Sequence, residues 1–173
     1  LQRKVVFLGH VITGEGIATD PAKTEEVNRW PIPRCTRDVR SFLGLCGYYR
    51  RFISQYAEIA FPLTSLLKKG LKFKGDETCQ EAFEKLKAAL TSPPILAMPR
   101  DEGTFFLDTD ASDHSIGAVL SQLQDGQERV IAYAAKVLQP AQVKYCAYRR
   151  ELLATLTFVR HFRNYLLGHH WVL

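Results

Sequence analysis

Hydrophobic side chains recur at intervals of three and four residues along much of the first half of the chain. The clearest run begins at Thr36 and is typical of a helix with one buried face. Its apolar positions are Val39, Phe42, Leu43, Cys46, Tyr49 and Ile53. The basic positions on its opposite face are Arg37, Arg40, Arg50 and Arg51. The pattern therefore predicts an amphipathic helix whose exposed side is basic.

Two local signals precede this helix. A β-branched run over residues 5–12, followed by the turn residues 13–16, predicts a strand or the edge of a hairpin. Asp20 followed by Pro21 predicts a helix start, because Asp accepts free amide hydrogens and Pro fits the first turn. We expect this short helix to end near Trp30.

Two more helices are predicted before residue 92. One covers about residues 59–69 and ends at Gly70. The other begins at Thr78, with Glu81 completing a capping box. Its buried positions are Phe83, Leu86 and Leu90.

The pattern changes after a stretch rich in proline and glycine at residues 92–103. Three extended runs follow, and the Asp125-Gly126 turn signal predicts that they form antiparallel strands. The runs cover residues 104–109, 116–123 and 129–133. A helix of about residues 142–167 comes next, and another strand begins near Trp171. The expected buried face of this helix is Tyr148, Leu152, Leu156 and Val159.

These elements predict an α+β protein, with a helical module followed by three antiparallel strands and a helix. The predicted divisions are a first domain at 1–92, a linker at 93–103 and a second domain at 104–173. The chain starts with Leu and stops inside an apolar run, so we expect it to be cut from a longer polypeptide.

Charge is divided unevenly between the halves. Residues 1–100 hold 16 basic and 10 acidic side chains, a net charge of +6, whereas residues 101–173 hold 7 and 8, a net charge of −1. The first half is expected to favour a polyanion, although a solvated basic surface without a partner is the alternative. No apolar run approaches the about 18 residues of a membrane helix, so we expect no membrane partner. The four widely spaced cysteines are typical of a reduced cytosolic or nuclear protein.

The densest acidic cluster is residues 108–113, at the end of a predicted strand. A calcium loop is disfavoured, because Asp113 and Val119 stand where Gly and Glu are needed. A turn capped by its own side chains and a metal-binding strand end both remain open. Side chains alternate along a strand, so Asp108 and Asp110 are expected to share a face.

Glu151 is the candidate partner of this cluster. It is the only acidic residue between Gln142 and Gly168. Alone, such a residue is usually a solvated surface charge. Carboxylates from a strand and a facing helix can instead hold a hard divalent cation such as Mg²⁺, which also coordinates phosphate oxygens. The sequence contains neither a Gly-x-x-x-x-Gly-Lys phosphate loop nor a Gly-x-Ser-x-Gly elbow.

An ordered set of short motifs spans nearly the whole chain and resembles gypsy-type LTR retrotransposon Pol proteins. The motifs of the first half, which resemble the segment after the polymerase palm, are Phe7-Leu8-Gly9-His10, Asp20-Pro21-Ala22-Lys23, Trp30-Pro31-Ile32-Pro33, Ser41-Phe42-Leu43-Gly44-Leu45, Tyr48-Tyr49-Arg50-Arg51-Phe52-Ile53 and Pro62-Leu63. Those of the second half, which resemble the start of the ribonuclease H domain, include Thr109-Asp110-Ala111-Ser112, Ile116-Gly117-Ala118-Val119-Leu120-Ser121-Gln122 and Glu151-Leu152-Leu153-Ala154.

The resemblance implies a reverse transcriptase thumb or connection region at 1–92, which grips a template–primer duplex, and the first part of a ribonuclease H-like fold at 104–173. Asp110 and Glu151 fall on two of that family's catalytic carboxylates, which bind two Mg²⁺ ions, or Mn²⁺ as the alternative, and cut the RNA strand of an RNA–DNA hybrid. Asp108 or Asp113 is an outer-shell candidate. The arginine face would contact nucleic acid.

The resemblance also sets limits. The polymerase Asp-Asp motif and the family's third and fourth ribonuclease H aspartates are not in the chain, so this fragment alone is expected to be inactive. The absent neighbouring strand would leave the Asp110 strand with an open edge. Gly75 and Ala135 stand where the family usually has Trp and Ser. The rival hypothesis is therefore a noncatalytic or domesticated nucleic-acid-binding or interaction module. The implied setting is a Pol polyprotein in the cytoplasm, or alternatively the nucleus.

Overall fold

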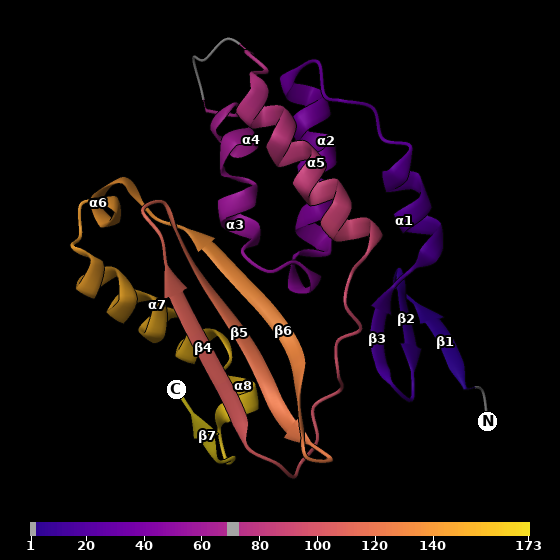
Figure 1. Ribbon diagram of the computed structural model, residues 1–173, viewed down its shortest axis with the longest axis vertical. Helices are drawn as coiled ribbons and strands as arrows, with labels where there is room; N and C mark the ends of the chain where they lie inside the picture. The colour runs from indigo at the N-terminus through magenta and orange to yellow at the C-terminus, as the bar shows by residue number, and fades with distance from the viewer. Residues whose placement is uncertain (1–2, 69–72) are drawn as a thin grey trace.

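The computed structural model describes residues 3–68 and 73–173 and has an α+β architecture, which confirms the predicted fold class (Figure 1). The chain forms a small three-stranded sheet, then a group of helices, then a larger sheet followed by further helices. None of the helices in the described ranges is long and apolar enough to cross a membrane.

The chain begins with an antiparallel meander in the order β1-β2-β3. Its strands are β1 (Lys4–Phe7), β2 (His10–Thr13) and β3 (Gly16–Thr19). The predicted hairpin edge with its turn at 13–16 is confirmed, because Thr13 pairs with Gly16, but the run 5–12 forms two strands and not one. Leu8 and Gly9 have φ angles of 48° and 70°, and this left-handed backbone turns the chain back on itself. Ile17 in β3 exchanges backbone hydrogen bonds with Leu96, which anchors the meander to the rest of the molecule.

The helical module contains α1 (Pro21–Asn28), α2 (Thr36–Tyr48), the 3₁₀-helix η1 (Arg50–Phe52), α3 (Tyr56–Ile59), α4 (Phe61–Ser65) and α5 (Glu77–Thr91). The predicted helix over 59–69 is instead two short helices. Pro62 lacks an amide hydrogen and lies in the first turn of α4, so α3 stops before it. The predicted end at Gly70 lies outside the described residues. Asp76, not Thr78, caps α5.

The first hydrophobic core lies between these helices. Its two central rings, Phe42 and Phe83, have centroids 4.6 Å apart. The fully buried members include Val39, Phe42, Cys46, Phe52, Ile53, Leu63, Phe83, Leu86, Leu90 and Leu96. The apolar spacing of α2 and α5 thus predicted the buried faces correctly.

The larger sheet has the order β6-β5-β4-β7. Its strands are β4 (Phe105–Ala111), β5 (Ser115–Gln124), β6 (Gln127–Val137) and β7 (Trp171–Val172). The first three are antiparallel, as predicted, and Asp110 lies opposite Gly117 in the register. The short β7 runs parallel to β4 and pairs only with Phe105 and Phe106.

The predicted helix over 142–167 is divided into α6 (Pro140–Val143), α7 (Ala147–His161) and α8 (Arg163–Leu166). α6 and α7 are separated at Cys146, whose backbone is extended and which occupies the N-cap position of α7. Three of the four predicted buried positions are also wrong, since Tyr148, Leu152 and Leu156 are 78%, 48% and 51% exposed, whereas Val159 is partly buried against the core. Ala154 and Phe158 face the sheet instead, on the neighbouring stripe of the same helix.

The second core lies between α7, α8 and one face of the larger sheet. Its members include Ala97, Phe105, Leu107, Ile116, Leu120, Ile131, Phe158 and Phe162. On the other face of the sheet, η1 and α3 contact β6 (Figure 1). The two cores divide between Leu96 and Ala97, inside the stretch 93–103 that we predicted as a linker.

Candidate functional site

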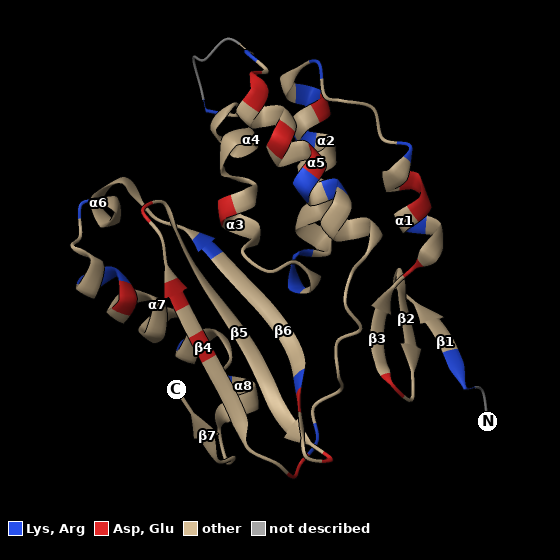
Figure 2. Cartoon of the chain, in the orientation of Figure 1, with Lys and Arg blue, Asp and Glu red and all other residues tan. Residues whose placement is uncertain are grey.

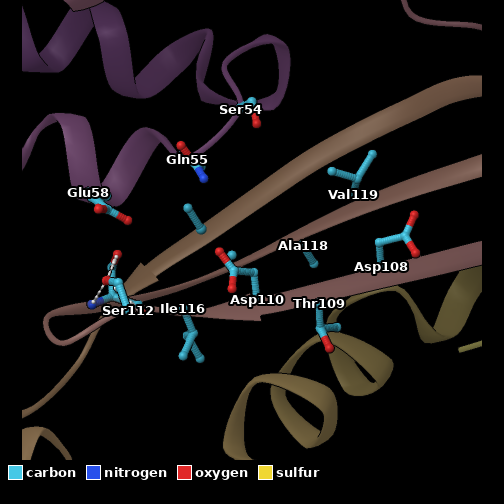
Figure 3. Close-up of a pocket in the computed structure, with 13 residues that line it drawn as sticks. Ser54, Gln55, Glu58, Asp108, Thr109, Asp110, Ser112, Ile116, Ala118 and Val119 are labelled. Atoms are coloured by element: carbon cyan, nitrogen blue, oxygen red, sulfur yellow. Dashed lines mark hydrogen bonds between the residues drawn. The ribbon is translucent and has the colours of Figure 1, made fainter. Parts of the chain in front are cut away.

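A cavity of about 130 Å³ opens beside the end of β4, on the side of the sheet that faces α3 (Figure 3). Asp108 and Asp110 both line it, as the alternation along the strand predicted. Glu58 of α3 lines the opposite wall. Three carboxylates thus face this space, and neither His nor Cys contributes to its lining.

Thr109 points the other way, toward α7. Its hydroxyl lies 3.3 Å from the hydroxyl of Thr155. Because neighbouring side chains of a strand point to opposite faces, this contact assigns Asp110 to the face that α7 does not cover (Figure 3).

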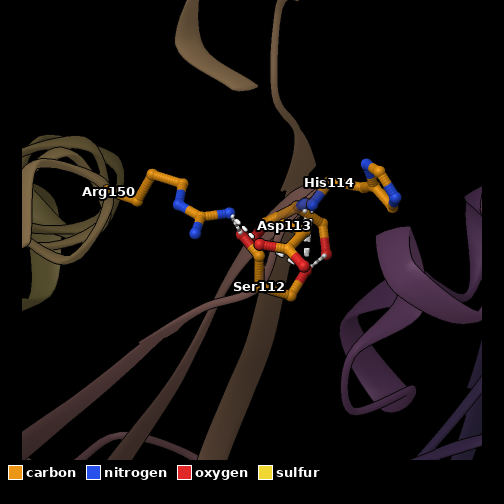
Figure 4. Close-up of polar contacts among 5 residues, drawn as sticks. Ser112, Asp113, His114 and Arg150 are labelled. Atoms are coloured by element: carbon orange, nitrogen blue, oxygen red, sulfur yellow. Dashed lines mark hydrogen bonds and ion pairs between the residues drawn. The ribbon is translucent and has the colours of Figure 1, made fainter. Parts of the chain in front are cut away.

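Glu151 belongs to α7, one turn before Thr155, and it is exposed. It does not line the Asp110 cavity. The start of α7 is nevertheless fixed beside the end of β4, because the Arg150 guanidinium donates to the Ser112 carbonyl at 3.0 Å and pairs with Asp113 (Figure 4). Asp110 and the start of α7 therefore lie near the same end of β4. Asp110 points to the side of the sheet that faces α3, whereas Glu151 belongs to the helix on the other side.

The edge of β4 between these two elements is open. Since β7 pairs only with Phe105 and Phe106, residues 107–111 have no partner strand on that side within the described part of the chain. An open edge was expected next to the Asp110 strand, and it is present over these five positions.

Side chains from both modules contact the turn that follows β4. Arg150 holds it from α7, and the ring of Phe61 in α4 stacks on His114 with centroids 4.6 Å apart. The hydrogen bond from Arg150 and its positive charge lower the pKa of Asp113. Asp113 is thus already engaged, whereas Asp108 and Asp110 form no ion pair in the described ranges. Of the two outer-shell candidates, Asp108 is the one with free oxygens.

The donor chemistry suits a hard cation. Carboxylate and hydroxyl oxygens are the groups that Mg²⁺ and Mn²⁺ prefer, and Asp108, Asp110 and Ser112 provide them at the cavity. The number of donors is small: across residues 3–68 and 73–173, no group of three or more His, Cys, Asp or Glu is arranged to hold a metal. The residues therefore offer the type of donor atom that the predicted ions prefer, but they do not form a complete set of ligands.

The four predicted nucleic-acid-binding arginines fall into two groups. Arg37 and Arg40 are exposed on α2. Arg50 and Arg51 belong to η1 and line a larger cavity against β6 and α7. The neighbouring aromatic pair divides as the helical spacing predicted, with Tyr49 buried and Tyr48 53% exposed.

Sequence reasoning missed Glu58 and the role of Arg150. Glu58 lies 52 positions before Asp110, and no local pattern links them. In the sequence, Arg150 is one of several arginines of its helix, and nothing local distinguishes it. Its contact with Ser112 depends on how α7 meets the end of β4, which is a tertiary property.

Three sequential antiparallel strands, a helix packed on one face and a parallel fourth strand define a ribonuclease H-like fold. The chain belongs to the family of RNase H-like domains found in reverse transcriptase, whose model matches residues 76–173. The match begins at Asp76, the N-cap of α5, ahead of the predicted linker, so the division at 92 and 104 stays a prediction.

Similar proteins include retrovirus-related Pol polyproteins of Drosophila melanogaster, which confirms the predicted resemblance. The polyprotein from transposon 297 is 42% identical over 174 residues, covering 100% of this chain and 16% of that protein. The polyprotein from transposon opus is 38% identical, covering 97% and 18%. The transposon Tf2-3 polyprotein of Schizosaccharomyces pombe is 34% identical, covering 95% and 12%. The chain thus spans less than a fifth of each of these relatives.

Two solved structures share the fold. A foamy viral protease-reverse transcriptase in complex with double-stranded DNA has a TM-score of 0.83 and 24% identity, covering 99% of this chain and 36% of that chain. The same kind of protein in complex with an RNA/DNA hybrid has a TM-score of 0.81 and 23% identity, covering 98% and 23%. These similarities extend through both modules of the present chain.

Proposed function

We propose that this chain is the thumb or connection region and the first part of the ribonuclease H domain of a retrotransposon reverse transcriptase. Its longer parent would cleave the RNA strand of RNA–DNA hybrids, with Asp110 and Glu151 as metal ligands. The observation that carries this proposal is the position of Asp110 at the end of β4, beside which Arg150 fixes the start of α7.

Asp110 and Glu151 would hold the cations, with Asp108 beside them. When bound, Mg²⁺ or Mn²⁺ supplies Lewis-acid activation of a water and stabilisation of the leaving 3′ oxygen. Arg150 would keep the turn after β4 against α7 while substrate binds. Further carboxylates from the parent would complete the ligand set, which is why the fragment alone is expected to be inactive.

The basic first half would grip the template–primer duplex or the hybrid through its phosphates, with Arg37, Arg40, Arg50 and Arg51 as contacts. Recognition would depend on backbone shape and on 2′-hydroxyl groups more than on base sequence. Support comes from the net charge of +6 over residues 1–100 and from solved relatives that hold double-stranded DNA or an RNA/DNA hybrid. The remainder of a Pol polyprotein would be the covalent partner, in the cytoplasm or the nucleus.

The test uses the longer parent protein and a labelled RNA–DNA hybrid. Mg²⁺-dependent cleavage should fall by at least about 100-fold in Asp110→Asn and in Glu151→Gln, since loss even of a group that supports a metal ligand costs about 10- to 100-fold. Asp101→Asn is the matched control, because Asp101 is exposed and forms no ion pair among the described residues. Mn²⁺ binding, measured by calorimetry, should weaken in the same two variants. Unchanged cleavage in Asp110→Asn would remove the site assignment.

The second candidate is a noncatalytic nucleic-acid-binding module of the same ancestry. The small number of metal donors within the described ranges favours it. In that case the parent binds the hybrid with an affinity that falls as salt rises, but neither Mg²⁺ nor Mn²⁺ supports cleavage. Measuring binding and cleavage on one preparation separates the two functions.

A further inference from the structure

A further cavity, of about 330 Å³, lies at one end of the helical module, where α2 and α5 begin beside α4. We call it the α5 pocket and define it by Val39, Leu63, Leu66, Phe73, Cys79 and Phe83. The most buried of these residues belong to the first hydrophobic core and are at most 7% exposed: Val39, Leu63, Cys79 and Phe83. The α5 pocket therefore has an apolar floor, and among the described residues it shares no lining residue with the Asp110 cavity.

The size and lining of the α5 pocket indicate a flat aromatic ligand. An apolar cavity of about 150 Å³ stays dry and binds one benzene ring, so a cavity of about 330 Å³ has room for two fused rings. Phe73 and Phe83 both line this space, and aromatic rings pack favourably against one another at their edges or with offset faces. Arg34 also lines it and is exposed, and a guanidinium group stacks on the face of an aromatic ring.

Asp76 supplies a polar group that can orient such a ligand. It lines the α5 pocket and is exposed, so its carboxylate lies where the pocket meets solvent. Its Oδ1 atom accepts hydrogen bonds from the Thr78 hydroxyl at 2.7 Å and from the Cys79 amide at 3.0 Å. Its Oδ2 atom accepts none from the residues that the structure describes. A ring N–H is the donor that suits a free carboxylate oxygen beside an apolar pocket.

We propose that the α5 pocket binds a small planar aromatic molecule that has two fused rings and one ring N–H, with indole as the probe. The rings would contact Phe73 and Phe83, and the N–H would donate to Asp76. Such a ligand would touch α2, α4 and α5 together and would stabilise the helical module, because it binds the folded state alone. The inference uses neither the proposed metal ligands nor the proposed nucleic-acid contacts.

The test titrates indole into the chain and follows binding by isothermal titration calorimetry and by Tm. Indole should bind with a Kd of about 1 mM or tighter, as expected of a buried ligand of this size, and Tm should rise with its concentration. Benzofuran has the same shape but an oxygen in place of the N–H, so it should bind more weakly. N-acetyltryptophanamide carries the same ring on a peptide-like group, so it tests whether the occupant is a side chain of another protein.

A substitution in the wall locates the bound ligand. Gly75 lines the α5 pocket, and its φ angle lies outside the left-handed range, so its backbone accepts a side chain. A Cβ atom added there would lie 3.3 Å from the Phe73 Cζ atom, which is the far end of a side chain that can shift. Gly75→Trp places a tethered indole in the pocket and should weaken binding of free indole by at least about 10-fold.

Gly44→Trp is the matched control, because Gly44 is an exposed position of α2 where an added Cβ meets open space. It should leave the affinity for indole unchanged. If Gly75→Trp does not melt cooperatively, Leu66→Trp, which narrows the same pocket beside α4, carries the test.

Four results would overturn the inference. Wild-type chain that binds no indole has no such site, and a Gly44→Trp variant that loses as much affinity as Gly75→Trp shows that indole is not bound in the α5 pocket. Equal affinities for indole and benzofuran would contradict the N–H donor, and tighter binding of N-acetyltryptophanamide than of indole would identify a protein side chain as the occupant. Hybrid cleavage by the parent is measured separately, so none of these results decides the proposed function.

Discussion

The two modules bury their helices to different extents. In the helical module, Val39, Phe42 and Leu86 are completely buried, and the apolar stripes of α2 and α5 close on each other. In the sheet module, α7 buries one stripe against β4 and leaves a second apolar stripe exposed at Tyr148 and Leu152. The apolar stripes of the helical module are therefore buried, whereas α7 of the sheet module keeps one apolar stripe exposed.

Charge follows the same division. β4 carries acidic residues and no basic ones, while η1 carries two arginines (Figure 2). The acidic positions lie at the open edge of the sheet module, and the basic ones lie on the closed module that faces it. The carboxylates of β4 and the arginines of η1 therefore come from different modules.

The largest expected effect concerns the closed core. Phe42→Ala removes a ring that is 0% exposed and packs on Phe83, so it should lower the free energy of unfolding by about 3–5 kcal/mol. Urea unfolding followed by circular dichroism measures it. A loss of less than about 1 kcal/mol would mean that the helical module is not the tightly packed unit described above.

The next effect concerns the connection between the modules. Gln122 is completely buried, accepts from the Arg100 amide at 2.9 Å and donates to the carbonyls of Arg100 and Glu102 at 2.8 and 3.0 Å. Gln122→Leu leaves these backbone groups without partners and should cost about 1–3 kcal/mol. Hydrogen exchange at the Arg100 amide should accelerate in parallel. Gln80→Leu, at an exposed position of α5, is the control and should leave both measurements nearly unchanged.

Local signals account for what could be predicted. Asp20 before Pro21, the alternation around Asp108 and the Asp125-Gly126 turn each act within a few residues, and the structure follows them. The buried face of α7 could not be read in this way, because the helix has two apolar stripes and only contact with β4 decides between them. The candidate site likewise contains residues that the sequence could place and one that it could not. Asp108 and Asp110 share a face by strand geometry, whereas Glu58 joins them through packing of α3 against the sheet.

A smaller effect depends on pH. Hydrogen bonds from Thr78 and Cys79 lower the pKa of Asp76, the N-cap of α5, to about 2. A carboxylate with a lower pKa in the folded state stabilises the fold above its unfolded pKa of about 3.9, and this contribution is lost as pH falls toward 2. Asp76→Asn keeps a capping side chain but cannot titrate, so the difference in Tm between wild type and variant should shrink between pH 4 and pH 2. A constant difference over that range would show that the cap does not act through its charge.

The smallest expected effect is that of a substitution on the exposed apolar stripe of α7, and it is compared with a substitution on the buried stripe. Leu152→Ser alters a side chain that is 48% exposed, so it should change the free energy of unfolding by no more than about 0.5 kcal/mol. Phe158→Ala, on the stripe that faces the sheet and 2% exposed, should cost about 3–5 kcal/mol. Equal losses in the two variants would mean that the Leu152 stripe is also buried in solution. The amphipathic pattern of the sequence would then have identified a real packing face, and the open side of the sheet module would have a partner.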